Sequence, residues 1–444
     1  MKSFVESSRH LTIGTDDTSI LNKKVASYGL HDDQGNHLTI AMMNTSATCG
    51  DEISLHLMKV LDDQEPSVRD MIKEKLVGVI TDRGPAAESG AKKFVKEFNR
   101  LHRVGLQPIF VMPCTMHMIS NGVSYMAGEL SKDAKETMSK VRRTLGDRQT
   151  GNLNKHSLCE AFKQYTGVGS PFASNLGCRF EHWPINGQNL VDFEMMLVKM
   201  LDEKKTLTPE QEQLHKLMKQ DNWTEIVLEC GALFVLYERL LFSFDNAVKS
   251  SSTTVGQLKI AMNELLTKMT VAEYAGLDTL IRYIDPRSDD VKDALKKLLI
   301  RFTSRTTSVD VKRRIDDFMR RAVIKLRIKV EKDFKLMNQA IDCGLDEDCI
   351  VPFHNRAAER SFSVMKAIHK KIGNLTDDNC YHVSIARQNQ LHCYLSALSD
   401  TSSAILTNKA RSKRVELLEK RRKRATELAR EKLAAEYNFT DLDE

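Results

Sequence analysis

Three strand-like segments follow one another at the start of the chain, and they constrain its fold more than any other feature. Residues 10–19, 25–32 and 37–46 are rich in β-branched and apolar residues, and a turn-forming Asp-Asp-Gln-Gly-Asn cluster separates the second segment from the third. Connections this short join antiparallel neighbours, because a parallel pair needs a crossover of about a dozen residues or more. The segments therefore predict an antiparallel meander.

The following residues alternate between helical and buried-strand patterns. Residues 51–61 and 86–101 carry apolar side chains at helical spacing, and a further helix is expected from Thr115. Residues 76–82 and 107–113 are short apolar runs, as expected of strands buried on both faces. Three antiparallel strands followed by helix, strand, helix, strand and helix is the order of an RNase H-like sheet. We therefore expect an α/β core with a mixed five-stranded sheet and helices.

Long amphipathic helices replace this alternation later in the chain, where strand patterns are almost absent. A stretch of this kind predicts an all-α domain that interrupts the α/β core. We expect the first part of the core at 1–150, a linker at 151–187, the all-α insertion at 188–345, completion of the core at 346–400 and a basic helical tail at 401–444.

Composition narrows the class of protein. The sequence has no run of about 18 apolar residues, so it predicts no membrane span. The N-terminus lacks the apolar segment of a secretory signal, and nine cysteines are scattered without a pairing pattern, which favours a reducing compartment. The net charge of +6 is small, but the tail is strongly basic. Its centre is a run of Lys420, Arg421, Arg422, Lys423 and Arg424.

This basic run has two interpretations. A cluster of this kind can act as a nuclear import signal or as an arm that contacts DNA. Glutamates at near-helical spacing to the basic residues instead favour a solvated charged helix. Both interpretations stay open.

Carboxylates stand where two of the predicted strands end. Asp16 and Asp17 close the first strand, and Asp82 closes the fourth. Each alone is explained by a turn or a helix cap. The first and fourth strands are neighbours in the predicted sheet, however, and two close carboxylates repel each other unless a cation lies between them. Mg²⁺ is suited to such a site, because it binds one or two carboxylates together with water and phosphate oxygens.

A Cys-x-x-His pair, Cys114 and His117, closes the fifth strand. This is half of a zinc site, but no second Cys/His pair has comparable spacing. We therefore expect no structural zinc. The simpler interpretation is a buried cysteine with a hydrogen-bonded histidine.

Four segments, taken in order, resemble the pattern of hAT-superfamily transposases and of host proteins derived from them. They are residues 16–19, 78–94, 108–117 and 358–372, with the sequences DDTS, GVITDRGPAAESGAKKF, PIFVMPCTMH and AERSFSVMKAIHKKI. The resemblance covers most of the chain up to about residue 395. Each motif is weak alone, whereas the ordered set is fairly specific.

The resemblance implies a catalytic triad. Asp16, Asp82 and Glu359 match the family's catalytic carboxylates, with Asp17 as the alternative to Asp16. Glu359 is selected by the resemblance alone. The three residues would hold two Mg²⁺ or Mn²⁺ ions for cleavage and transfer of DNA strands.

The resemblance also implies contacts with double-stranded DNA. Cys114 and His117 match a motif near the transposon end. Arg179-Phe180 resembles an Arg-Trp pair that often precedes the insertion, and Trp183 is a possible replacement for its aromatic residue. The last helical region implies a homodimer or higher oligomer, and the activity implies a nuclear protein.

Two classes of function compete. Full-length relatives often begin with a BED-type zinc finger, and only about ten residues precede the first strand here. That absence favours a catalytically silent, transposase-derived protein that binds DNA or other proteins. Retention of all three candidate carboxylates favours the active enzyme. A helical scaffold with an incidental α/β region does not explain the ordered motifs.

Overall fold

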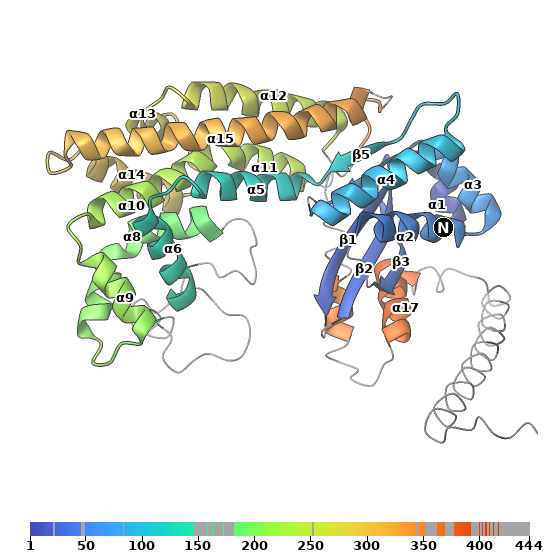
Figure 1. Ribbon diagram of the computed structural model, residues 1–444, viewed down its shortest axis with the longest axis horizontal. Coiled ribbons are helices and arrows are strands. Elements are labelled where there is room, and N and C mark those ends of the chain that lie inside the picture. The colour runs from blue at the N-terminus through green and yellow to red at the C-terminus, as the bar shows by residue number, and fades with distance from the viewer. Residues whose placement is uncertain are drawn as a thin grey trace, which may run out of the picture.

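The computed structural model describes residues 1–20, 23–45, 49–82, 84–145, 182–250, 253–342, 345–350, 362–368 and 377–391, together with single positions between and beyond these ranges. A five-stranded sheet lies at one end of the molecule, and a bundle of helices lies beside it (Figure 1).

The sheet has the strand order β3-β2-β1-β4-β5. Its first three strands pair antiparallel, and β1, β4 and β5 pair parallel. The prediction of a mixed five-stranded sheet is therefore confirmed. The strands are β1 (Leu11–Ile20), β2 (Lys23–Asp32), β3 (His37–Asn44), β4 (Leu76–Thr81) and β5 (Phe110–Pro113).

Helices from the first hundred residues cover one face of the sheet (Figure 1). They bury apolar side chains of alternate strand positions, as expected where one face of each strand points to a helical layer. The strand side chains include Leu11, Ile13 and Val79, which pack with Leu57 and Phe94 from the helices. The helices are α1 (Lys2–Ser7), α2 (Gly50–Asp62), α3 (Pro66–Lys75) and α4 (Pro85–His102).

Two groups of helices cover the opposite face. On the β4–β5 side, Ile80 and Met112 belong to the core formed by α5 (Thr115–Ala127) and the helical bundle, and the long helix α15 (Val309–Asp342) reaches β5. On the β2–β3 side, residues 362–368 and α17 (Asp377–Gln388) cover the sheet.

The helical bundle lies to one side of the sheet, and α15 runs the length of the bundle toward the sheet (Figure 1). No described residue between 115 and 345 is in a strand. In addition to α5 and α15, the bundle contains α6 (Lys132–Leu145), α8 (His182–Glu203), α9 (Pro209–Met218), α10 (Trp223–Leu236), η1 (Tyr237–Leu241), α11 (Phe242–Lys249), α12 (Val255–Ala272), α13 (Leu277–Arg282) and α14 (Asp289–Thr303).

The helical part begins earlier than the sequence suggests. Helices α5 and α6 share the buried core of the bundle, although residues 1–150 were assigned to the α/β core. Helix α8 begins at His182, within the expected linker. Pro184 stands near the start of α8, where its missing amide hydrogen costs no helical hydrogen bond. The Gly-, Ser- and Asn-rich composition before residue 188 is typical of a loop, so the sequence did not predict the start of this helix.

Within the described part of the chain, no helix is both long enough and apolar enough to cross a bilayer.

Candidate active site

The candidate site lies where β4 ends and its parallel pairing with β1 stops. The sequence placed Asp16 and Asp17 at the end of the first strand, but β1 continues past them to Ile20, because this stretch still pairs with β2. Thr15 and Thr81 are register partners on these adjacent parallel strands. Asp16 and Asp82 come directly after them in the sequence. Open α/β sheets bind their ligands at the carboxyl ends of their parallel strands, and β4 ends at this level, beside Thr15 of β1. The pairing therefore brings the two aspartates to one edge.

Asp16 and Asp82 line the same small pocket. The pocket has a volume of about 20 Å³, which is room for about one water molecule or ion. Asp17 also lines it, and Ile53 of α2 and Ala87 of α4 close it from the helical layer. Both aspartates thus border one cavity, although the strand register places the Asp16 side chain on the face of the sheet opposite α2 and α4.

Backbone amides hold both carboxylates. Oδ1 of Asp16 accepts a hydrogen bond from the amide of Asp17 at 2.8 Å, and Oδ1 of Asp82 accepts one from the amide of Gly84 at 3.1 Å. A Cβ on Gly84 would lie 3.2 Å from that same Oδ1, so glycine allows the loop to approach the carboxylate closely.

Asp17 differs from Asp16 in its surroundings. Its carboxylate forms an ion pair with Lys24 of β2 at 3.1 Å, and its side chain is 36% exposed. Asp16 is 8% exposed. Burial and the charge of Asp17 raise the pKa of Tyr28, so this neighbouring phenol stays neutral. Lys24 of the chain therefore compensates the charge of Asp17.

The donor set around the pocket consists of oxygen atoms. Besides the carboxylates, the hydroxyl residues Thr15, Thr45 and Thr81 line the pocket. Thr81 is 1% exposed, and its hydroxyl has no hydrogen-bond partner among the described residues. Hard oxygen ligands suit Mg²⁺ and Mn²⁺ rather than softer metals. The residues present therefore fit a small divalent cation.

These hydroxyl groups were missed in the sequence. A Thr-Asp pair stands in both strands where their parallel pairing stops, at residues 15–16 and 81–82. The repetition of this pair was the signal that could have identified them.

The Cys-x-x-His pair begins at the same edge of the sheet. The amide of Cys114 donates a hydrogen bond of 3.0 Å to the carbonyl of Thr81. The Cys114 side chain is 1% exposed and packs in the core of the bundle, so it is not accessible to DNA in this structure. His117, in the first turn of α5, is partly buried. The simpler interpretation of a buried cysteine fits Cys114, and DNA contact by His117 stays a prediction.

Trp183 lies in the first turn of α8. Its ring stacks at a tilt beside His182, with 5.4 Å between ring centroids, and packs partly buried against the bundle core. A contact between Trp183 and DNA stays a prediction. Glu359, Arg179 and residues 420–424 lie outside the described residues.

A row of paired residues links Asp16 to the late part of the chain. Asp16 of β1 pairs with Ser27 of β2, which pairs with Met42 of β3. Directly paired residues share one face of a sheet. Met42 packs with Phe362 and Met365 in a separate buried cluster. Residues 362–368 therefore pack on the face of the sheet that carries Asp16.

No protein-family model matches this chain, and a search of curated proteins finds no significant relative.

Proposed function

We propose that this chain is the catalytic core of a hAT-type DNA transposase, which cleaves and transfers DNA strands with Asp16, Asp82 and Glu359. One observation carries the proposal: Asp16 and Asp82 border a single pocket where the parallel pairing of β1 with β4 stops. Two neighbouring carboxylates repel each other, and a cation bound between them would relieve this repulsion.

The architecture supports an RNase H-like assignment. The strand order and the change from antiparallel to parallel pairing at β1 are those expected of such a sheet. The described helices between β5 and residue 362 are consistent with an all-α insertion into that core.

Glu359 is assigned as the third carboxylate on two grounds. Its motif resembles that of the family, and Phe362, three positions later, packs on the face of the sheet that carries Asp16. In the described part of this helix, Phe362 and Met365 are buried while Ser363 and Lys366 are exposed.

Bound Mg²⁺ or Mn²⁺ would supply activation of a water or 3′-hydroxyl and stabilisation of the leaving oxygen. The residues of the chain would bind the metal ions and position them. Asp16 and Asp82 provide negative charge at a fixed edge of the sheet, and the amides of Asp17 and Gly84 hold these carboxylates in place. The hydroxyl of Thr81, which has no hydrogen-bond partner in the described part of the chain, provides a further oxygen at the pocket wall.

Duplex DNA is the proposed substrate and the nucleus the proposed site of action. The protein would act as a dimer or higher oligomer, as the resemblance implies. Basic residues of the helices and of the tail would contact phosphates, which gives affinity that is sensitive to salt and largely independent of sequence.

The test is Mg²⁺- or Mn²⁺-dependent cleavage of duplex DNA that carries the terminal repeats flanking the gene. We expect Asp82→Asn and Asp16→Asn to reduce cleavage by about a hundredfold or more, because a bound metal contributes several kcal/mol to transition-state stabilisation. Asp17→Asn is the matched control and keeps most of the activity. Cleavage that survives in Asp82→Asn would refute the assignment.

A further inference from the structure

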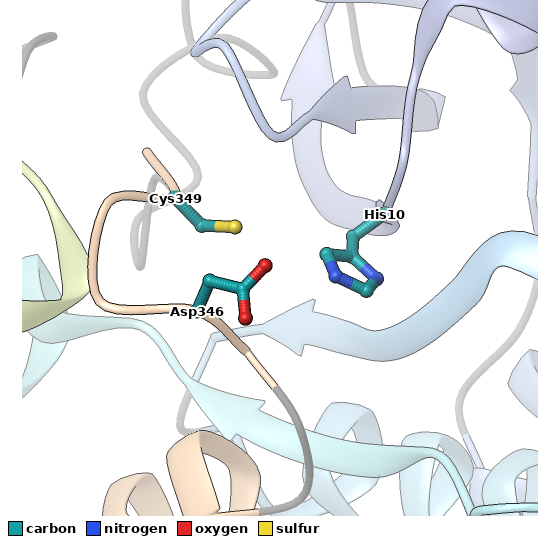
Figure 2. A group of neighbouring side chains, drawn as sticks. All are labelled: His10, Asp346 and Cys349. Atoms are coloured by element: carbon teal, nitrogen blue, oxygen red, sulfur yellow. The ribbon is translucent and has the colours of Figure 1, made fainter.

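Three side chains of the kinds that bind transition metals converge at a junction away from the pocket described above. His10, Asp346 and Cys349 each offer one ligand atom, and these atoms lie within 4.8 Å of one another. Figure 2 shows that the imidazole, the carboxylate and the thiol point toward a common space. His10 immediately precedes β1, whereas the other two residues belong to the loop after α15.

Backbone hydrogen bonds fix the loop that carries two of these ligands. The amide of Cys349 donates to the carbonyl of Asp346 at 3.0 Å, which closes a turn between the two residues. The carbonyl of Cys349 accepts from the amide of Val255 at 2.8 Å, and the amide of Ile350 donates to the carbonyl of Asp33 at 3.0 Å. The Asp-x-x-Cys spacing of this turn equals the spacing of paired cysteines in zinc sites.

Carboxylates outnumber the guanidinium that pairs with them at this junction, which favours binding of a cation. Arg9 pairs with Asp33 at 2.9 Å, with Asp346 at 3.3 Å and with Asp348 at 3.5 Å. One guanidinium thus faces three carboxylates. Arg9 is held firmly by Asp33, which also accepts a hydrogen bond from the Arg9 amide at 2.8 Å. Arg9 also donates to Cys349 Sγ at 4.0 Å, so a metal ion would have to displace the guanidinium from Asp346 and Cys349, and Arg9 would keep Asp33 and Asp348.

His10 also borders a cavity that is larger than the pocket at Asp16 and Asp82. His10 lines a cavity of about 300 Å³, together with Arg9, Lys75 and Arg103. Three protein ligands leave one position of a tetrahedral ion open.

We propose that His10, Asp346 and Cys349 bind one zinc ion, which joins the segment before β1 to the loop after α15. Nitrogen, oxygen and sulfur donors in one site are characteristic of Zn²⁺ rather than of Mg²⁺ or Ca²⁺. The ion would connect residues 336 positions apart (346 minus 10), where the chain returns from the helical bundle to the sheet. The sequence predicted no structural zinc, because spacing along the chain does not reveal ligands so far apart.

Cobalt(II) titration of the full chain tests the site, because a thiolate ligand gives Co²⁺ a charge-transfer absorption that oxygen ligands do not. The Asp82→Asn variant serves as the background, so that the oxygen-lined pocket does not contribute. We expect one equivalent of Co²⁺ to give the thiolate band and Zn²⁺ to displace it. Cys349→Ser should abolish the band, whereas Cys49→Ser, which alters an exposed thiol elsewhere, should retain it. Absence of the band, or its survival in Cys349→Ser, would overturn the proposal.

A second measurement covers the case in which Cys349→Ser does not fold. Asp346 is 60% exposed, so Asp346→Asn should fold normally. In the wild type, excess Zn²⁺ should raise the unfolding temperature by a few degrees relative to a chelator, because the ion binds only the folded state. Asp346→Asn should lose this rise, and Asp348→Asn should keep it. An equal rise in both variants, or no rise in the wild type, would contradict the zinc site.

Discussion

Thr15 of β1 and Thr81 of β4 are paired in register on adjacent parallel strands, and an aspartate follows each of them. This register brings Asp16 and Asp82 into one pocket. A shift of one residue in either strand would turn one aspartate to the opposite face of the sheet. The relationship between the two threonines is therefore the structural basis of the proposed metal site.

The close approach of α2 and α4, which bound the pocket, depends on a glycine. A Cβ on Gly90 would lie 2.6 Å from the side chain of Ile53. We expect Gly90→Val to destabilise the protein by about 1–3 kcal/mol, because the two helices must separate. Lys96→Val, at an exposed position of α4, should cost less than about 1 kcal/mol. Urea unfolding of both variants measures the difference, and equal stabilities would contradict the packing described.

The buried cluster that packs residues 362–368 against the sheet should affect cleavage by positioning Glu359, and not by contacting DNA. Met365 is 1% exposed in this cluster. Met365→Ala leaves a cavity and should reduce metal-dependent cleavage about tenfold or more, because Glu359 lies shortly before it in the chain and small displacements of catalytic groups are costly. Met365→Leu conserves volume and should restore cleavage. Duplex affinity should be unchanged in both, and equal cleavage by the two variants would contradict a positioning role.

An ion-pair network between the end of α5 and α15 should make stability depend on pH. Hydrogen bonds from Lys325, and also Arg321 at 3.2 Å, lower the pKa of Glu129 despite partial burial. A lowered carboxyl pKa stabilises the folded state above the unfolded value of about 4.3, and this contribution disappears as the pH falls through the folded pKa. Glu129→Gln should therefore cost about 1 kcal/mol at neutral pH and nothing in acid. Urea unfolding of the wild type and of Glu129→Gln from neutral to acid pH measures this difference in stability. A difference that stays constant with pH would contradict the prediction.

Duplex binding should be separable from cleavage. Phosphate contacts dominate the affinity of proteins for DNA, so the logarithm of the affinity should fall linearly with the logarithm of the salt concentration. Asp82→Asn should keep this dependence. Replacing the basic residues at 420–424 with glutamine should reduce the slope by about 0.9 for each phosphate that the tail no longer neutralises. Fluorescence anisotropy with a labelled duplex measures both effects, and affinity independent of salt would exclude the proposed mode of binding.

The sequence predicted the sheet well because its signals are local. The short connections before residue 46 and the apolar runs at 76–82 and 107–113 each specify a strand type without reference to distant residues. The helix α3 was not predicted. It begins with Pro66 at a favourable first helical position, but only Val68 and Ile72 are buried, so its apolar pattern is weak.

The candidate site was predictable only in part. Asp16 and Asp82 could be found because the adjacency of their strands follows from the order of elements, although Asp16 lies within β1 and not at its end as predicted. The pairing of Asp17 with Lys24 could not be found, since it depends on the register of two strands. The convergence of His10 with Cys349 was hidden for a related reason, because it depends on how the helical bundle returns the chain to the sheet.

The central claim is that Asp16 and Asp82 share one metal ion, and Mn²⁺ binding to the full chain tests it most directly. The paramagnetic resonance of free Mn²⁺ gives the affinity of each protein for the ion. The measurement compares this affinity among the wild type, Asp16→Asn, Asp82→Asn and the double variant. If one ion requires both carboxylates, each single variant loses as much affinity as the double variant, because neighbouring ligands are not additive. Independent losses that add up in the double variant, or no loss in either single variant, would contradict the shared site.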